Sequence, residues 1–296
     1  MSEPLSGVAG LPAAPSRILE VEVQPVTEPS LYPIRDVARL TGVNPVTLRA
    51  WQRRYGLVVP QRTEKGHRLY SEQDIALIRR ILAWLELGVS IGQVRPLLEQ
   101  DPPAAKGLPD HWQEKVESLD SALLVLNQRQ LESLLGELTA NYPLPLLRRQ
   151  VFSPWLAHLA RHLERPDGAA LYAYALNFLE IYFGRRLVTQ DKGDPLTLAG
   201  VGRLPPLELV LCAMEAREAG FMVTLLPQLT AREARLLAPR LSGPLLVLVG
   251  AGVPGEVSDS WPEGTVLLGE MLSLYPDYAG GAFPGVGEWL AAREGT

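Results

Sequence analysis

The chain has 296 residues, of which 47% are apolar, and a formal net charge of −5 at pH 7. This length and composition provide for two or three globular domains and exclude wholesale disorder. One cysteine, Cys212, excludes an internal disulfide and a thiolate cluster and is typical of a reducing compartment. Because no apolar run indicates export or a membrane span, we expect a cytoplasmic protein.

The charge is unevenly distributed along the chain. Residues 1–30 are rich in Pro, Ser, Ala and Gly without periodicity, which predicts a mobile tail. Residues 31–100 are helical in pattern and carry 11 Lys and Arg against 6 Asp and Glu, a net charge of +5 that leaves −10 for the rest. Although the total charge argues against nucleic acid as a partner, this asymmetry indicates that residues 31–100 face a polyanion.

Two short helices joined by a tight turn are predicted at the start of the basic segment. The first runs from Ile34 to Leu40, and Gly42 suits the left-handed position that ends it. Asn44 is a favourable N-cap and Pro45 a favourable first residue for a second helix reaching about Tyr55. We expect this helix to expose polar and cationic side chains, namely Thr47, Arg49, Gln52 and Arg53. The pattern predicts a helix-turn-helix whose second helix enters a DNA groove.

A cationic hairpin is predicted next. Two short extended arms flank the turn at Lys65–Gly66, and Arg62, Lys65 and Arg68 give the hairpin its charge. Such a hairpin is interpreted as a wing that contacts the sugar-phosphate backbone. Ser71 is a favourable N-cap for a helix that begins at Glu72, and the negative charge of Asp74 interacts favourably with the dipole of that helix.

The run Thr47–Leu57, followed by Gly66–Ser71, resembles the MerR family of transcription regulators. More narrowly, it resembles the branch that holds cobalamin-dependent light regulators of the CarH and LitR type and cobalamin-independent activators of the MlrA type. Gln52 stands where that branch usually has Glu. The resemblance implies that Arg49 contacts the major groove or its phosphates. It also implies contacts to the flanking backbone from Trp51, Arg62, Arg68 and Tyr70.

The complete set of DNA contacts predicted from these patterns is Thr47, Arg49, Trp51, Gln52, Arg53, Arg62, Lys65, His67, Arg68 and Tyr70. Packing in a core is an open alternative for Trp51, and a solvated face is one for Arg53. His67 has no metal-ligand spacing around it, so we expect no metal site there.

Three further segments follow, which makes the predicted fold class multidomain α and α/β. Pro102 and Pro103 interrupt the helical pattern, and residues 101–114 are predicted as a linker. Residues 115–192 predict a helical bundle broken by prolines. Residues 193–296 alternate short apolar runs with helical stretches, which predicts a parallel sheet. The expected strands are Leu196–Val201, Phe221–Leu226, Leu245–Val249 and Thr265–Leu268, and the expected helices are Leu207–Ala219 and Thr230–Leu241.

The resemblance implies that this C-terminal module is flavodoxin-like, a doubly wound sheet of the cobalamin-binding type. In cobalamin-binding relatives a loop histidine ligates cobalt, and the bundle supplies a Trp and a Glu-His pair. Here the loop Gly202–Leu209 has no histidine, and the last histidine of the chain is His162. Gly280–Gly281 resembles the paired glycines under the nucleotide tail of such cofactors. We therefore expect a degenerate module without a cofactor.

Two other clusters in the bundle invite functional interpretations. His158 and His162 are four residues apart, but no third metal ligand accompanies them. Apolar side chains recur at helical spacing and either pack in the core or line a small-molecule pocket between bundle and sheet: Trp155, Tyr172, Tyr174, Phe178 and Tyr182.

These features predict a sequence-specific DNA-binding transcription regulator that acts at promoters, independently of cobalamin. Its expected partners are double-stranded promoter DNA, a second copy of the chain bound through the C-terminal modules, and indirectly RNA polymerase, with no membrane. The alternative is a regulator gated by cobalamin or a nucleotide and responsive to light or ligand. An acidic C-terminal protein-interaction module is a further alternative. An enzyme is not expected, because the sequence has no glycine-rich phosphate loop and no nucleophile–base pairing.

Overall fold

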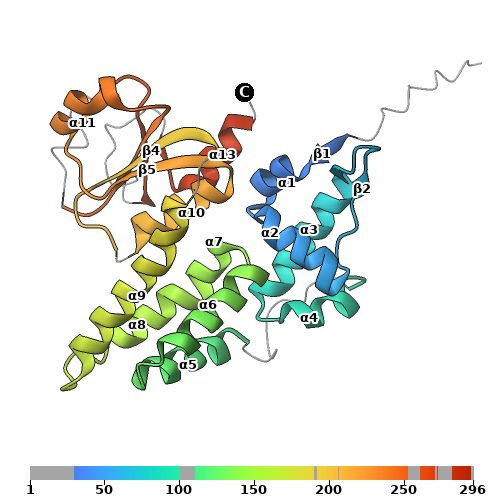
Figure 1. Cartoon of the computed structure of the whole chain (residues 1–296), viewed down its shortest axis with the longest axis horizontal. Helices are drawn as coiled ribbons and strands as arrows, with labels where there is room; N and C mark the ends of the chain where they lie inside the picture. The colour runs from blue at the N-terminus through green and yellow to red at the C-terminus, as the bar shows by residue number, and fades with distance from the viewer. Residues whose placement is uncertain are drawn as a thin grey trace, which may run out of the picture.

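The computed structural model describes residues 30–100, 111–189, 192–205, 207–252, 261–270, 272 and 282–294. The predicted tail up to residue 29, the first ten residues of the predicted linker and Gly280–Gly281 lie outside them. The chain forms three units, which follow one another in sequence and are packed side by side (Figure 1). No helix in the described ranges is long and apolar enough to cross a membrane.

The N-terminal unit has the two helices and the hairpin that the sequence predicts. Its elements are β1 (Leu31–Pro33), α1 (Ile34–Thr41), α2 (Pro45–Ala50), a π-helical turn (Trp51–Tyr55), β2 (Gln61–Arg62), β3 (Arg68–Ser71), α3 (Glu72–Glu86), α4 (Ile91–Val94) and a 3-10 turn (Arg95–Leu97). Gly42 ends α1 with φ +68°, and the Asn44 side chain accepts a hydrogen bond from Thr47 N. Ser71 and Asp74 form a capping box at α3. The predicted caps are confirmed; α1 extends one residue beyond its predicted end, to Thr41, and the second predicted helix is α2 continued by the π-helical turn to Tyr55.

The second unit is a helical bundle. It consists of α5 (His111–Leu124), α6 (Gln128–Asn141), α7 (Leu144–Leu147), a π-helical turn (Arg148–Phe152), α8 (Ser153–Ala160) and α9 (Gly168–Val188). Leu119, Leu131 and Phe183 are among the fully buried side chains that form its interior. Because α5 begins at His111, the predicted linker extends too far in the C-terminal direction.

The third unit is an α/β domain with a parallel sheet of five strands, in the order β5-β4-β6-β7-β8. The strands are β4 (Asp194–Val201), β5 (Phe221–Leu226), β6 (Leu245–Val249), β7 (Val266–Leu268) and β8 (Ala282–Phe283), and the helices described here are α10 (Glu208–Glu218), α11 (Ala231–Leu237) and α13 (Val286–Glu294). The four predicted strands are confirmed; the two-residue β8 was not predicted.

Helices cover both faces of this sheet. Successive side chains of a strand point to opposite faces. Leu196 and Leu198 of β4 pack in one core cluster with residues of α10 and α13. Ala199 and Val201 of the same strand pack in another cluster with Ala234 of α11. The sheet is therefore buried on both sides, which explains its near-continuous apolar strands.

The three units share a buried core and polar contacts. One apolar cluster extends from Val37 in α1 through the bundle to Met214 in α10. Trp112 Nε1 of α5 donates to Leu85 O of α3 at 2.9 Å. Between bundle and α/β domain, Arg148 and Glu208 form an ion pair at 2.8 Å.

Candidate nucleic-acid interface

The second helix of the N-terminal unit has one solvent-facing side. Arg49 and Arg53 are exposed there, together with Val46, which is 62% exposed. These positions are three and four residues apart and therefore lie on one helix face. Gln52 is half-buried beside them. The face combines two guanidinium groups with an amide, groups suited to base edges and phosphates.

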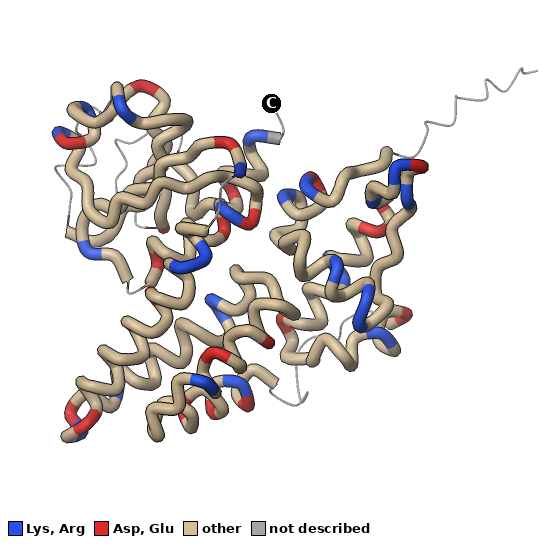
Figure 2. The backbone as a smooth tube through the Cα atoms, viewed as in Figure 1, with Lys and Arg blue, Asp and Glu red and all other residues tan. Residues whose placement is uncertain are grey.

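The hairpin continues this cationic face. Thr63 N donates to His67 O at 2.9 Å and Gly66 N to Thr63 O at 2.8 Å, which closes a short turn. Arg62, Lys65 and His67 are exposed. Figure 2 shows Lys and Arg along the helices and hairpin of the N-terminal unit.

A side-chain contact fixes the hairpin relative to the helix. Arg68 Nε donates to Gln52 Oε1 at 2.9 Å. Burial raises the pKa of the Tyr70 hydroxyl, while the positive charges of Arg68 and Arg49 oppose that rise. The hydrogen bond from Arg68 to Gln52 therefore holds the two parts of the face together.

Three predicted DNA contacts lie in the protein interior, which corrects their assignment. Thr47 and Trp51 have no exposed surface, and Tyr70 is 1% exposed. Trp51 Nε1 donates to the backbone oxygen of Asn141 at 2.7 Å. The reason is that one side of α2 packs against α6 of the bundle, and Tyr70 belongs to the same core cluster. For Trp51 the alternative, packing in a core, is the one observed.

Asn141 is an important residue that the sequence analysis missed. It is 4% exposed, and its Oδ1 accepts hydrogen bonds from Arg54 Nη1 and Tyr55 OH, each at 3.2 Å. Its Nδ2 donates to Glu137 O at 2.8 Å. We call α2 and the π-helical turn that continues it (45–55) the reading helix. The asparagine thus anchors the C-terminal end of the reading helix to the bundle. An Asn at the end of an amphipathic helix carries no local signal for such a role.

The aromatic cluster and the histidine pair of the bundle lie where the following contacts place them. Trp155 is fully buried, whereas Tyr174, Phe178 and Tyr182 line a groove of about 420 Å³ between α6 and α9, not between bundle and sheet. The His158 and His162 rings meet edge to face at 4.8 Å. In the described ranges no group of three His, Cys, Asp or Glu is placed to hold a metal ion.

Comparison with known proteins agrees with the sequence resemblance. Residues 32–101 match the family described as MerR HTH family regulatory protein. The chain is 43% identical over 125 residues to the HTH-type transcriptional regulator MlrA of Salmonella typhimurium (strain SL1344), covering 42% of this chain and 50% of the relative. For MlrA of Escherichia coli (strain K12) the identity is 39% over 144 residues, covering 49% and 57%.

A longer match extends beyond the N-terminal unit. The HTH-type transcriptional repressor CarH of Myxococcus xanthus is 28% identical over 214 residues, covering 67% of this chain and 71% of the relative. The chain spans about half the length of the MlrA relatives it matches.

Proposed function

We propose that this chain, whose helix-turn-helix domain belongs to the MerR family in the branch that holds MlrA and CarH, is a DNA-binding transcription regulator that acts at promoters. One observation carries the proposal most directly. The exposed cationic face of α2 and the exposed cationic hairpin are joined by the hydrogen bond from Arg68 to Gln52. A helix and a hairpin fixed in this way form a winged helix-turn-helix, and they bind a groove and its adjacent backbone as one rigid surface.

The exposed and half-buried residues of this surface divide into two roles. Arg49, Gln52 and Arg53 lie on the helix and contact base edges and nearby phosphates in the major groove. The hairpin residues contact sugar and phosphate, which sets orientation and supplies affinity but carries no sequence information. These residues are Arg62, Lys65, His67 and Arg68.

The test begins with selection of binding sites from a random duplex library, followed by fluorescence anisotropy at several KCl concentrations. We expect Arg49→Gln to cost about 1–3 kcal/mol of binding free energy on the selected site and to reduce discrimination. Arg232→Gln, an exposed arginine on α11, is the matched control and leaves affinity unchanged. Equal affinity of the chain for selected and scrambled duplexes would contradict the proposal.

We also propose that the C-terminal module is flavodoxin-like and acts without cobalamin. Numbered along the chain, its strands have the order 2-1-3-4-5, that of flavodoxin-like sheets. The loop after β4 has Arg203 and no histidine, and it is paired with the loop after β6 through Arg203 N to Ala251 O at 3.0 Å and Ala251 N to Arg203 O at 2.9 Å. These residues do not fit a cobalt-ligating loop, so no step of the proposed mechanism uses that cofactor. Incubation with adenosylcobalamin followed by desalting tests this; retained corrinoid absorbance would contradict it.

Binding as a dimer is part of the proposal. A two-fold operator favours a symmetric protein. In the described part of the N-terminal unit that follows α3, residues 87–100, no long helix is present to pair two copies: α4 has four residues and the 3-10 turn ends at Leu97. We therefore place dimerisation in the C-terminal modules, with the effect on RNA polymerase exerted through the bound promoter. Sedimentation of the full chain with and without its selected duplex tests this, and a strictly monomeric complex would refute it.

A further inference from the structure

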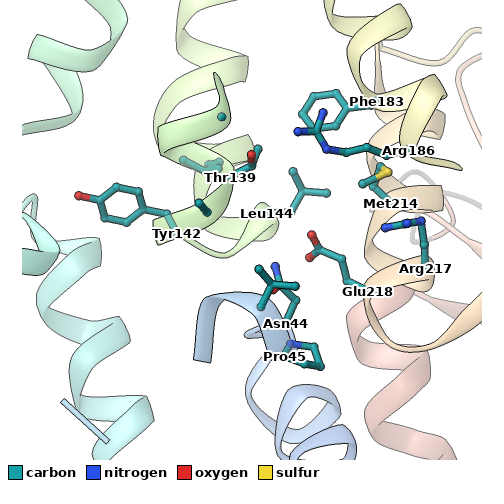
Figure 3. A pocket seen from close by; sticks show the side chains of 14 residues that line it. Asn44, Pro45, Thr139, Tyr142, Leu144, Phe183, Arg186, Met214, Arg217 and Glu218 are labelled. Atoms are coloured by element: carbon teal, nitrogen blue, oxygen red, sulfur yellow. The ribbon is translucent and has the colours of Figure 1, made fainter. Parts of the chain in front are cut away.

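A cavity of about 380 Å³ lies where the three units meet. Its walls come from the start of α2, from α6 and α7, from α9 and from α10 (Figure 3). Its volume is within the range of small-molecule sites. Val46 at the start of α2 borders both the cavity and the exposed face, whereas Arg49 and Arg53 do not line the cavity.

Two arginines give the cavity its charge. Arg186 of α9 and Arg217 of α10 line the cavity, and Figure 3 shows the guanidinium of Arg186 beside the ring of Phe183. Arg186 is held in place, because its Nη1 donates to Tyr182 O at 3.1 Å and its Nη2 to Tyr182 OH at 2.6 Å, with the guanidinium 3.8 Å from the ring centre. The Nε of Arg217 is buried and has no hydrogen-bond partner among the described residues. A buried donor without a partner is uncommon in native structures.

One acidic group faces the two arginines. The carboxyl of Glu218 lies between Asn44 and Leu144 (Figure 3). Burial raises the pKa of Glu218 to about 7, while the Asn44 side chain and the charges of Arg217 and Arg186 lower it and Glu215 raises it. Two guanidinium groups against one carboxyl leave the cavity positive, and they favour an anion there.

The remaining walls combine apolar side chains with the polar residues Asn44, Thr139 and Tyr142, and they include one glycine. Leu144, Phe183 and Met214 line the cavity. Gly136 also lines it, in the middle of α6, and an added Cβ there would have nothing within 4 Å. Glycine is unfavourable in a helix interior. Because Gly136 has no side chain, the space next to it remains part of the cavity.

We propose that this cavity binds a small amphipathic organic anion. Its anionic group lies between Arg186 and Arg217, a hydroxyl or amine donates to Glu218, and its apolar body packs on Leu144, Phe183 and Met214.

Binding here acts on the reading helix through Asn44. The Oδ1 of this residue caps α2 by accepting from Thr47 N at 2.8 Å, and its side chain also faces Glu218. A ligand that donates a hydrogen bond to Glu218 changes the surroundings of the cap and hence the docking of α2 on the bundle. This coupling rests on the proposed DNA-binding function, whereas binding in the cavity does not.

The experiment uses the full chain without DNA, titrated with phenyl phosphate, phenylacetate, benzyl alcohol and inorganic phosphate and followed by calorimetry and saturation-transfer NMR. We expect the two aromatic anions to bind at least about tenfold more tightly than benzyl alcohol, because a charge-assisted hydrogen bond contributes that much. The ratio of the dissociation constants for phenyl phosphate and phenylacetate identifies the preferred anion. The difference in affinity between phenyl phosphate and inorganic phosphate gives the contribution of the apolar walls.

Two variants locate the site. Gly136→Leu places a side chain in the cavity, with open space at its Cβ, and weakens binding, whereas Gly184→Leu, also at a helical glycine with open space at its Cβ, leaves binding unchanged. Arg217→Gln weakens binding of the anions about tenfold but not that of benzyl alcohol. Failure of both aromatic anions to bind, or equal binding by Gly136→Leu and wild type, overturns the proposal.

A second readout separates this inference from the DNA-binding proposal. Anisotropy of the selected duplex is measured with and without saturating 4-hydroxyphenylacetate, an aromatic anion whose hydroxyl can donate to Glu218. A change in DNA affinity that Gly136→Leu removes supports the coupling, and an unchanged affinity overturns the coupling. If the chain binds no DNA, the calorimetric result in the absence of DNA still decides the cavity.

Discussion

Replacing Trp51 by Phe separates a structural role of this residue from a role in DNA contact. The ring of Trp51 is fully buried, and its Nε1 donates to Asn141 O at 2.7 Å. Phe keeps most of the apolar packing but leaves that carbonyl without its donor, which costs about 1–3 kcal/mol. The lost ring volume adds about 1 kcal/mol. We expect a total loss of about 2–4 kcal/mol of unfolding free energy, a large part of the stability of a typical domain.

The assay compares two variants in two measurements. Urea unfolding followed by circular dichroism reports stability, and anisotropy of the selected duplex reports affinity at a temperature where every variant is folded. Trp51→Phe is expected to lower stability and to leave affinity unchanged. Because the Arg49 side chain is exposed, we expect Arg49→Gln to keep an unfolding free energy within about 0.5 kcal/mol of wild type and to bind the duplex more weakly.

One result would refute the reasoning. If Trp51→Phe is as stable as wild type but binds the duplex more weakly, Trp51 contacts DNA directly. The packing of α2 against α6 would then not persist in solution.

Three further predictions concern the turn, the hairpin and the cavity. Gly42→Ala meets no atom within 4 Å but must keep φ at +68°, so urea unfolding should show a loss of about 1–2 kcal/mol; a neutral result would contradict the left-handed turn. Lys65→Gln should weaken binding equally on selected and scrambled duplexes and reduce the salt slope by about 1, and a selective loss would show base contact. The pKa of Glu218 is raised from 4.5 to about 7 in the folded chain, so its contribution to stability is fully present below pH 4.5 and falls by roughly 3 kcal/mol as pH rises from 4.5 to 7. Glu218→Gln should remove this part of the pH dependence, and identical stability profiles from pH 5 to 8 would disprove it.

The sequence alone was sufficient for features set by neighbouring residues. Gly42, Asn44 and Pro45 specify the end of one helix and the start of the next through backbone conformation and capping, which act within a few residues. The capping box of Ser71 and Asp74 is equally local. The strands of the α/β domain were predictable because apolar runs bounded by turn residues suit a sheet buried on both faces. The two-residue β8 is too short to produce such a pattern.

Only the tertiary structure decided which polar and aromatic side chains are exposed to solvent. Thr47, Arg49 and Trp51 lie on the same helical stretch, and the sequence predicts all three as DNA contacts. In the folded chain Thr47 and Trp51 are buried, and Trp51 is bonded to Asn141 of α6, 90 residues further along the chain. The same contact gives Asn141 its role. The cavity likewise brings together groups from α2, α6, α9 and α10. Burial is set by packing between distant segments, and periodicity within one helix shows which residues share a face but not what covers that face.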